Sequence, residues 1–444
     1  MNPPPTQTHQ VVLAALCGVA AISYMSRNCL GVAVADGRIG IDLGMSDREM
    51  AWAMGAFFAS YSLFQIPSGW IVHQFGSRRA LPLFCTVWSM ATAAMGLAVG
   101  FISLLAGQLS IGLAQAGVFP ASTQSISHWM PATRRAVACG WLASCMSVGG
   151  AIAVALTGWM LQEMSWRWVF FVFCSPGVVW AAAFYYWFRD QPNQHKAVNQ
   201  AELNLICGAS SGISVTQAAE PPSPEPTRWR ALFTSLPMWL ICGQQFFRAA
   251  GYAFYGTWFP KFLKETQGVS TVEAGYLSSL PLLATVLGAL MSGFVTDWIL
   301  VKTGSRRWSR QGVAVAAMLG CAVFTLLAYF AKDARSAVLL ITAGSLCAAF
   351  GSPCAYAITI DMGGKQVPMV FSLMNTTGNL GAFLCPILVE RLVAGTGNWN
   401  LVLLCFAGIF LSAALCWACL NPNGSVFRPA LERGAPSKNQ NLHE

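Results

Sequence analysis

Two arginines lie inside long apolar stretches of this chain, away from acidic residues. Arg27 belongs to the stretch 11–35 and Arg248 to the stretch 237–259. At 1.5 Å per residue, Arg27 lies roughly 24 Å from the start of a helix over 11–35. No carboxylate occurs within four residues of either arginine, so neither has a partner on its own helix. A planar guanidinium suits a carboxylate or a phosphate, and the pair therefore predicts a binding site for a small anion.

Each arginine also has a structural interpretation, because a charge inside hydrocarbon faces either a cavity or a partner. Arg27 could pair with Asp36 or with carbonyl groups at the end of its helix. Arg248 could pair with Asp361 or Glu390 across helices. The sequence leaves these alternatives open.

Polar and aromatic residues in the same apolar stretches could complete an anion site. Amides and hydroxyls offer directional hydrogen bonds, and aromatic rings stack on the apolar face of a sugar acid. Buried amides also serve helix packing, so each candidate has a structural alternative. The candidates for substrate binding are Tyr24, Tyr61, Gln115, Gln244, Gln245, Tyr252, Tyr255, Asn375, Thr376 and Asn379.

The composition indicates that these residues are carried by membrane-spanning helices. Of the 444 residues, 55% are hydrophobic and 10% are charged, whereas a typical soluble domain is about 25% charged. The mean hydropathy is +0.53. A helix needs about 20 apolar residues to cross hydrocarbon. Twelve stretches meet this condition: 11–35, 50–72, 80–100, 103–127, 136–160, 167–188, 237–259, 273–296, 310–331, 337–360, 369–393 and 399–420.

The twelve spans fall into two sets of six. We expect an N-terminal six-helix bundle over 1–188, a cytoplasmic linker over 189–236, a C-terminal six-helix bundle over 237–420 and a cytoplasmic tail over 421–444. The linker is rich in Pro, Ser and Gly, which favours a flexible segment over the alternative of a small helical domain. Lys and Arg are roughly twice as frequent on the side of both termini, which predicts cytoplasmic termini. The net charge of +9 is therefore a topology signal, and no nucleic-acid partner is expected.

The loops after the second and eighth spans repeat one pattern. We predict gating roles for the residues of this pattern, which are Gly69, His73, Gly76, Arg78 and Arg79 in the first half and Gly293, Asp297, Arg306 and Arg307 in the second. The same motif at equivalent places in two six-helix halves indicates a duplicated transporter.

These loops resemble the hallmark G-x-x-x-D-x-x-G-x-R-R motif of the major facilitator superfamily, which the chain resembles over nearly its whole length. Stretches 24–28, 61–69, 112–120, 166–168, 258–260 and 374–379 are also similar to the anion:cation symporters, the group that contains hexuronate and galactonate transporters and sialin. This resemblance implies an all-α membrane protein with twelve transmembrane helices in two pseudo-symmetric six-helix bundles. It places the substrate between the halves, near Tyr61, Gln115 and Asn375. The first helix is also similar to that of organophosphate:phosphate antiporters.

The chain departs from the symporter pattern at its titratable positions. Galactonate-type symporters have an Asp before the first-span arginine, a Glu in the fourth span and an arginine that pairs with this Glu. Ser26, Gln115 and Gln108 stand at these places here. Neither Ser nor Gln titrates in the accessible pH range, so proton coupling is not expected to carry over.

The expected function is alternating-access transport of a small organic anion, a sugar acid such as a hexuronate or an aldonate. We expect a monomer in the lipid bilayer of a bacterial inner membrane. The alternatives are an organophosphate/phosphate exchanger and a transport-dead membrane sensor of the same fold. An enzyme is not expected, because the five His show no HxxxH or HExxH spacing. No cofactor and no metal are expected either.

Overall fold

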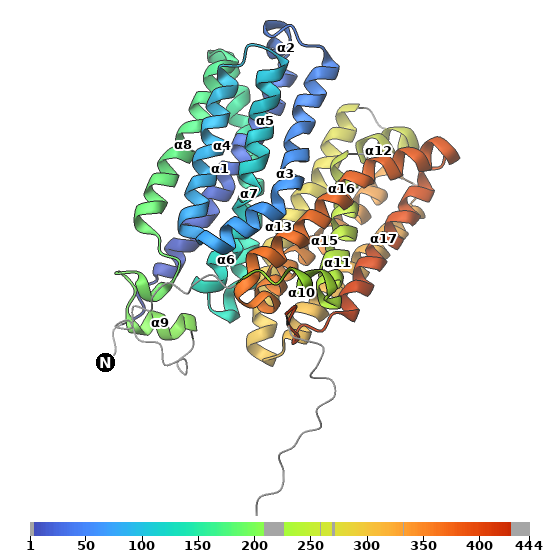
Figure 1. Ribbon diagram of the computed structural model, residues 1–444. Helices are drawn as coiled ribbons and strands as arrows, with labels where there is room; N and C mark the ends of the chain where they lie inside the picture. Colours follow the sequence, from blue (N-terminus) through green and yellow to red (C-terminus); the bar gives the residue numbers. More distant parts are fainter. Residues whose placement is uncertain (1–3, 208–225, 258, 269–270, 332, 428–444) are drawn as a thin grey trace, which may run out of the picture.

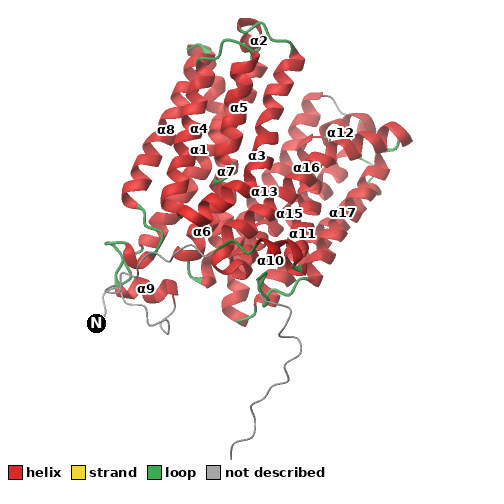
Figure 2. Cartoon of the chain, viewed as in Figure 1, coloured by secondary structure: helices red, strands yellow, loops and turns green. Residues whose placement is uncertain are grey.

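A computed structural model describes residues 4–207, 226–257, 259–268, 271–331 and 333–427. This part of the chain consists of helices joined by turns and loops (Figure 2). Figure 1 shows the helices as two groups that stand side by side. The linker segment 208–225 and the tail segment 428–444 lie outside the described residues.

The first group of helices comes from the N-terminal part of the chain. Helix α1 packs against α7, α3 against α5, and α4 against α8. Short helix α2 caps this group at one end, and α6 continues from α5 at the other (Figure 1). The bounds are α1 Thr8–Ala35, α2 Arg38–Asp42, α3 Asp47–Phe75, α4 Ser77–Gly96, α5 Phe101–Gln115, α6 Val118–Trp129, η1 Ala132–Arg134, α7 Arg135–Glu163 and α8 Trp166–Trp187.

The second group comes from the C-terminal part of the chain. Helix α11 packs against α16, α13 against α15, and α14 against α17. The bounds are α11 Leu236–Thr257, α12 Phe259–Gln267, α13 Thr271–Thr303, η3 Arg307–Gly312, α14 Val313–Tyr329, α15 Ala334–Gly363, η4 Gly364–Gln366, α16 Val367–Thr396 and α17 Trp399–Cys419. The turn η3 is a π-helical start of α14.

The described helices confirm the predicted all-α membrane fold. Eight stretches are long and apolar enough to cross a membrane, and one of them, Ala334–Thr396, contains both α15 and α16. Helices α3, α4 and α11 complete the twelve predicted spans. The predicted span 103–127 is divided between α5 and α6, and the short helices α2 and α12 were not predicted.

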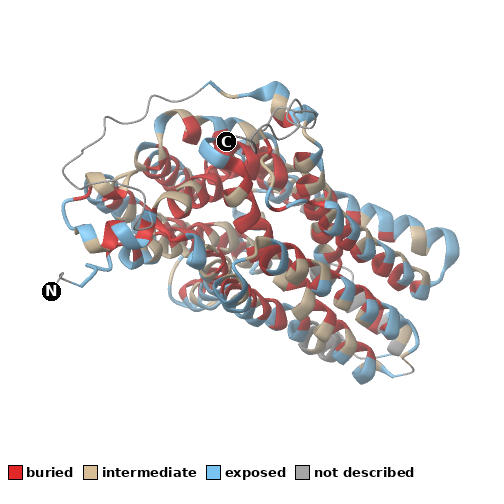
Figure 3. Ribbon diagram, turned by 90° about the horizontal axis from the view of Figure 1, so that it is seen from below, coloured by how far each residue is buried: buried red, intermediate tan, exposed pale blue. Residues whose placement is uncertain are grey.

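The outer faces of both groups are apolar, as a lipid-facing surface requires. Leu63, Val179 and Phe383 are 75%, 69% and 66% exposed. An exposed apolar surface of this extent is not stable against water. Figure 3 shows buried residues within each group and along the line where the groups meet, with exposed residues on the outside.

One face of the molecule carries the N-terminal residues together with η2 (Pro192–Gln194), α9 (Gln200–Cys207) and α10 (Trp229–Thr234), and we call it the terminal face (Figure 1). There the buried Glu202 accepts hydrogen bonds from His9 N and His9 Nδ1, both at 2.8 Å. Helix α9 is thereby fixed to the start of α1. The opposite face carries α2 and α12.

Candidate functional site

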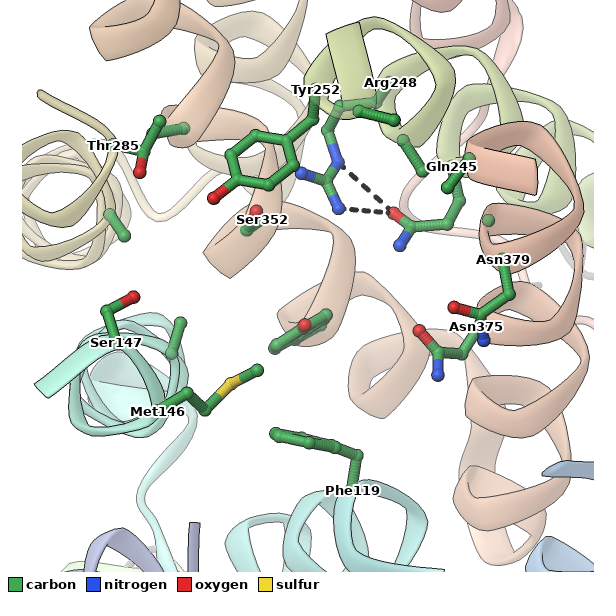
Figure 4. Close-up of a pocket in the computed structure, with 18 of the residues that line it drawn as sticks. Phe119, Met146, Ser147, Gln245, Arg248, Tyr252, Thr285, Ser352, Asn375 and Asn379 are labelled. Atoms are coloured by element: carbon green, nitrogen blue, oxygen red, sulfur yellow. Dashed lines mark hydrogen bonds between the residues drawn. The ribbon is translucent and has the colours of Figure 1, made fainter. Parts of the chain in front are cut away.

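A cavity of about 290 Å³ lies between the two groups of helices. It is lined by residues of α1, α3, α6 and α7 from the first half and of α11, α13, α15 and α16 from the second (Figure 4). Its volume is near the lower end of the range for small-molecule sites, about 300–1,000 Å³. The cavity thus has room for one small molecule that contacts both halves.

Arg248 extends from α11 into this cavity and is 8% exposed (Figure 4). Its Nε and Nη2 donate to Gln245 Oε1 at 3.3 and 3.0 Å. A Cβ on Gly351 of α15 would lie 2.9 Å from Arg248 Cδ, so the glycine leaves room for the arginine stem. The amide one turn earlier orients the guanidinium without neutralising it.

Arg27 reaches the same cavity from α1. Its Nη1 donates to the Tyr24 hydroxyl oxygen at 3.4 Å. Four aromatic rings surround its Cζ at 4.4 to 5.4 Å from their centroids: Tyr24, Phe57, Phe58 and Tyr61. Ring faces attract a cation through their quadrupole but carry no net charge.

The acidic partners considered from the sequence are engaged elsewhere or lie at the surface. Asp36 pairs with Arg38, and Asp361 pairs with Arg135 and Arg310. Glu390 is exposed on α16. The alternatives that paired Arg27 with Asp36, or Arg248 with Asp361, are therefore wrong. Within the described part of the chain, neither cavity arginine forms an ion pair with a carboxylate.

Several predicted polar residues line the cavity beside the arginines. Tyr24, Tyr61, Gln245, Tyr252, Asn375 and Asn379 are all part of its wall. Asn375 Nδ2 donates to the Tyr61 hydroxyl oxygen at 3.5 Å, which links α16 to α3 across the halves. Asn379 Nδ2 is buried and has no partner among the described residues. A buried donor left unpaired is costly, and a bound ligand can satisfy it.

Three other predicted residues are not part of the cavity wall and donate to backbone carbonyls instead. Gln115 donates from Nε2 to Ser23 O at 2.9 Å and so joins α5 to α1. Gln244 donates to Ile241 O at 3.0 Å, one turn earlier on α11. Thr376 donates to Ser372 O at 2.9 Å within α16. The Tyr255 side chain lies outside the described residues.

The cavity also contains residues that sequence reasoning missed. They carry hydroxyl groups or an aromatic ring but were not singled out as candidates, and they are Phe119, which lies within the stretch 112–120, and Ser147, Thr285, Ser352 and Tyr356. Tyr356 is almost fully buried and packs edge-on against Phe371, with ring centroids 5.1 Å apart. Its only signal in the sequence was a lone phenol in an apolar span.

The glycines of the repeated motif allow the two halves to approach closely at the terminal face. Gly69 of α3 faces α16, where an added Cβ would clash with Ser372 and lie 2.8 Å from Pro368 O. Gly293 of α13 faces α7, where a Cβ would lie 2.9 Å from Ala136 O. The two contacts are equivalent under exchange of the halves, which agrees with an internal duplication.

A cluster of four charged residues joins the halves next to these glycines, and we call it the gate cluster: Arg135, Asp297, Arg310 and Asp361. Arg310 Nη1 donates to Asp297 Oδ1 at 2.8 Å, and its Nε donates to Asp361 Oδ2 at 3.2 Å. Arg135 Nη1 donates across the halves to Asp361 Oδ1 at 3.0 Å.

The first turn of α7 adds backbone bonds to this cluster. Val137 N donates to Asp297 Oδ2 at 2.7 Å. A carboxylate at this place satisfies a free N–H group and meets the positive end of the helix. Asp297 thus joins α13 to α7 across the halves, and its gating role stays a prediction; His73 takes the equivalent place in the first half.

The motif arginines contribute less to the contact between halves. Arg79 and Arg307 are exposed, and Arg306 is partly exposed. The charge that was expected from Arg306 and Arg307 comes instead from Arg310, which is fully buried. Sequence reasoning also missed Arg135 and Asp361 as gate residues, because their partners are more than 50 positions away.

Gly76 and Arg78 shape a turn within the first half. Gly76 has a φ of 74°, which favours glycine, and a Cβ there would lie 2.6 Å from Asp190 Oδ2. Arg78 N donates to Asp190 Oδ1 at 3.0 Å, so the carboxyl caps the start of α4. Burial raises the pKa of Asp190, and the backbone donors of Arg78 and Ser77 partly offset this effect.

Comparison with known sequences gives the family. The sequence profile of the Major Facilitator Superfamily matches residues 16–307 and 245–440. A probable sulfoacetate transporter of Cupriavidus necator is 28% identical over 428 residues, covering 96% of this chain and 97% of the relative. A probable galactarate/D-glucarate transporter of Escherichia coli K12 is 27% identical, covering 89% of each chain. A D-galactonate transporter of Escherichia coli O6:H1 is 28% identical, covering 88% of this chain and 91% of the relative.

Solved structures of similar fold are transporters as well. The proton:xylose symporter XylE superposes with a TM-score of 0.71 at 13% identity, covering 93% of this chain and 97% of the other. FucP in the outward conformation superposes with a TM-score of 0.69 at 13% identity, covering 93% and 99%. At this identity the likeness shows the fold. Together with the duplicated six-helix halves, the repeated loop motif and the cavity between the halves, these matches show that the chain belongs to the Major Facilitator Superfamily and is a multi-pass membrane protein.

Proposed function

We propose that this protein is an alternating-access transporter of a small organic anion that carries a carboxylate or sulfonate group. The observation that carries this proposal is the presence of Arg27 and Arg248 in one cavity between the halves, without a protein acid to neutralise either. An anion that enters from water supplies the missing negative charge. Arg27 and Arg248 supply the positive charge that attracts the anion, and the neighbouring phenols and amides bind its hydroxyl groups.

The names of the relatives support this cargo. They are described as transporters of sulfoacetate, of galactarate and D-glucarate, and of D-galactonate. Each of these molecules is a short, polar organic acid. A sugar acid is therefore the first candidate for this chain, and Tyr24, Tyr61, Tyr252, Asn375 and Asn379 are the side chains that would bind its hydroxyl groups.

The transport cycle follows from the position of the gate cluster. If both termini are cytoplasmic, as the charge bias predicts, the contacts of Gly69, Gly293 and the gate cluster close the cytoplasmic side. The cavity then takes up its anion from the outside. Release into the cytoplasm requires the bonds from Arg135 and Val137 to break while the opposite ends of the helices come together.

The cargo moves without a proton in this proposal. The cavity wall contains no Asp, Glu or His among the described residues. The neutral substitutes for the symporter residues are used in packing: Ser26 donates to Ile22 O at 3.2 Å, Gln115 to Ser23 O, and Gln108 to Met95 Sδ at 3.1 Å. Facilitated diffusion or anion exchange remain as the modes of transport. We place the protein in a bacterial inner membrane as a monomer.

A second candidate is organophosphate exchange against phosphate. It is favoured by one observation, namely that the two arginines occupy corresponding helices of the two halves, α1 and α11. A phosphate group offers enough oxygen atoms to accept hydrogen bonds from both guanidinium groups at once.

The deciding experiment is uptake by proteoliposomes that contain the purified protein. Radiolabelled sugar acids, sulfonates and sugar phosphates are compared, with and without a pH gradient. The proposal predicts saturable uptake of an organic acid that Arg248→Gln abolishes and that a pH gradient does not drive uphill. Uptake of sugar phosphates alone would support the second candidate, and uptake of neutral sugars alone would refute both.

A further inference from the structure

The protein holds each cavity arginine with neutral groups. Gln245 Oε1 accepts from Nε and Nη2 of Arg248, at 3.3 and 3.0 Å. Aromatic rings and the Tyr24 hydroxyl surround Arg27. These contacts fix the direction of each guanidinium but leave its charge in place. The remaining N–H groups stay available to a ligand.

The charge of the cavity wall is therefore plus two. Its described lining residues include Arg27 and Arg248 and no Asp, Glu, Lys or His. A cargo with one negative charge would leave one guanidinium uncompensated when the cavity closes around it. A buried charge without a partner is unfavourable. A cargo with two negative charges leaves neither guanidinium uncompensated.

The two arginines have separate surroundings, which favours one anionic group for each. Arg27 lies among rings of the first half, from α1 and α3, whereas Arg248 is held by Gln245 and Gly351 of the second half. Tyr252, Asn375 and Asn379 contribute polar groups to the wall of the same cavity. These groups suit the hydroxyls of a carbon chain better than a second acid group, because they carry no charge.

The size of the cavity suits a short chain. Its volume of about 290 Å³ lies near the lower end of the range for small-molecule sites, about 300–1,000 Å³. A short acid with a few hydroxyl groups is a cargo of this size.

We propose that the cargo is a short dianion with an acid group at each end, a dicarboxylate or a sulfocarboxylate, and that Arg27 and Arg248 each bind one of the two groups. This inference rests on the proposed function and names its substrate class. Because the arginines belong to opposite halves, such a cargo bridges the halves and favours closure of the cavity around it. A monocarboxylate engages one half through an ionic contact and leaves the other arginine open.

The test compares two acids that differ only at one end. Galactarate has a carboxylate at both ends, and galactonate has a CH₂OH group in place of one. Their dissociation constants are measured by calorimetry with the full-length protein in lipid nanodiscs. We expect galactarate to bind about 10- to 100-fold more tightly, the effect of one additional charge-assisted hydrogen-bonded pair. In Arg27→Gln and in Arg248→Gln the preference falls below about threefold, because the second carboxylate has no cation.

The controls separate this inference from loss of folding and from failure of the proposed function. Arg391→Gln removes an exposed arginine of α16 and keeps the preference. Thermal unfolding of each variant without ligand reports whether it is folded. If a Gln variant does not fold, Arg248→Lys is used, which keeps the charge and hence part of the preference.

Equal binding of the two acids by the unaltered protein overturns the dianion proposal but leaves the proposed function intact. Tight binding of inorganic phosphate that needs both arginines also overturns it, because a single group would then occupy both. If the protein binds neither acid and also fails to bind a sulfocarboxylate such as sulfoacetate, both this inference and the proposal of sugar-acid transport are contradicted.

Discussion

Replacement of Arg135 by Gln is predicted to open the terminal face without unfolding the protein. Arg135 Nη1 and Asp361 Oδ1 are 3.0 Å apart, and their side chains are 19% and 2% exposed. The bond joins α7 of one half to α15 of the other, so it exists only while this face is closed. A charge-assisted hydrogen bond that is largely shielded from water is worth about 1.5–3 kcal/mol. Its loss raises the open population about 10- to 150-fold.

Hydrogen–deuterium exchange measures this population. The Val137 amide donates to Asp297 Oδ2 across the halves, so it is protected in the closed state and exchanges when the face opens. In Arg135→Gln, peptides from the start of α7 and the end of α15 should exchange about 10- to 150-fold faster. Asp36→Asn is the matched control, because the Asp36–Arg38 pair lies within one half at the opposite face. If Arg135→Gln raises the exchange rate by less than about twofold, the bond is worth no more than an ordinary surface ion pair. This result would refute its role in holding the terminal face closed.

Three further predictions concern the cavity and the contact between halves. Arg27→Lys keeps the charge but loses the planar fork and the stacking on four rings, so uptake should fall at least about tenfold; full uptake by this variant would contradict a guanidinium-specific grip. Gly69→Leu places a side chain against Ser372 and Pro368. The terminal face should therefore stay partly open, and hydrogen–deuterium exchange at the start of α16 should rise. Unchanged exchange would show that α3 and α16 are not in close contact at Gly69. Vesicles preloaded with the transported acid should take up labelled acid faster than empty vesicles. In empty vesicles the transporter must return with an empty cavity that closes over two unpaired charges, which is unfavourable. Equal rates, or accumulation driven by a pH gradient, would contradict anion exchange.

The fold could be predicted from the sequence because its determinants are local. About 20 consecutive apolar residues suffice to indicate a membrane helix, and the loop motif repeats at Gly69 and Gly293. The division of the fourth span between Gln115 and Val118 was not foreseen. Helix α12 was missed because it is short and amphipathic.

The cavity was only partly predictable because a helix has several faces. Arg27 and Arg248 could be found by their charge alone, since an arginine in hydrocarbon needs an explanation wherever it points. Gln115 could not be assigned in this way, because an amide that bonds Ser23 O and an amide that bonds a cargo look the same in sequence. Tyr356 lines the cavity because of the way α15 is rotated about its axis. It was missed because the sequence does not give this rotation.

The gate cluster depended on contacts that no local pattern contains. Asp361 was considered as a partner of Arg248, yet it binds Arg135 and Arg310, which lie 226 and 51 positions away along the chain. Arg310 is the first residue of the predicted span 310–331, and no role in the contact between halves was predicted for it. Its burial becomes evident only when η3 is packed between α13 and α15.

Two arginines without protein counter-charges form the proposed anion site. Equilibrium binding of radiolabelled galactarate to the double variant Arg27→Gln, Arg248→Gln tests this site, with thermal unfolding as the check of its fold. We expect a folded protein without saturable binding, while the Arg391→Gln variant binds like the unaltered chain. Saturable binding to the double variant with an unchanged dissociation constant would show that the anion binds elsewhere.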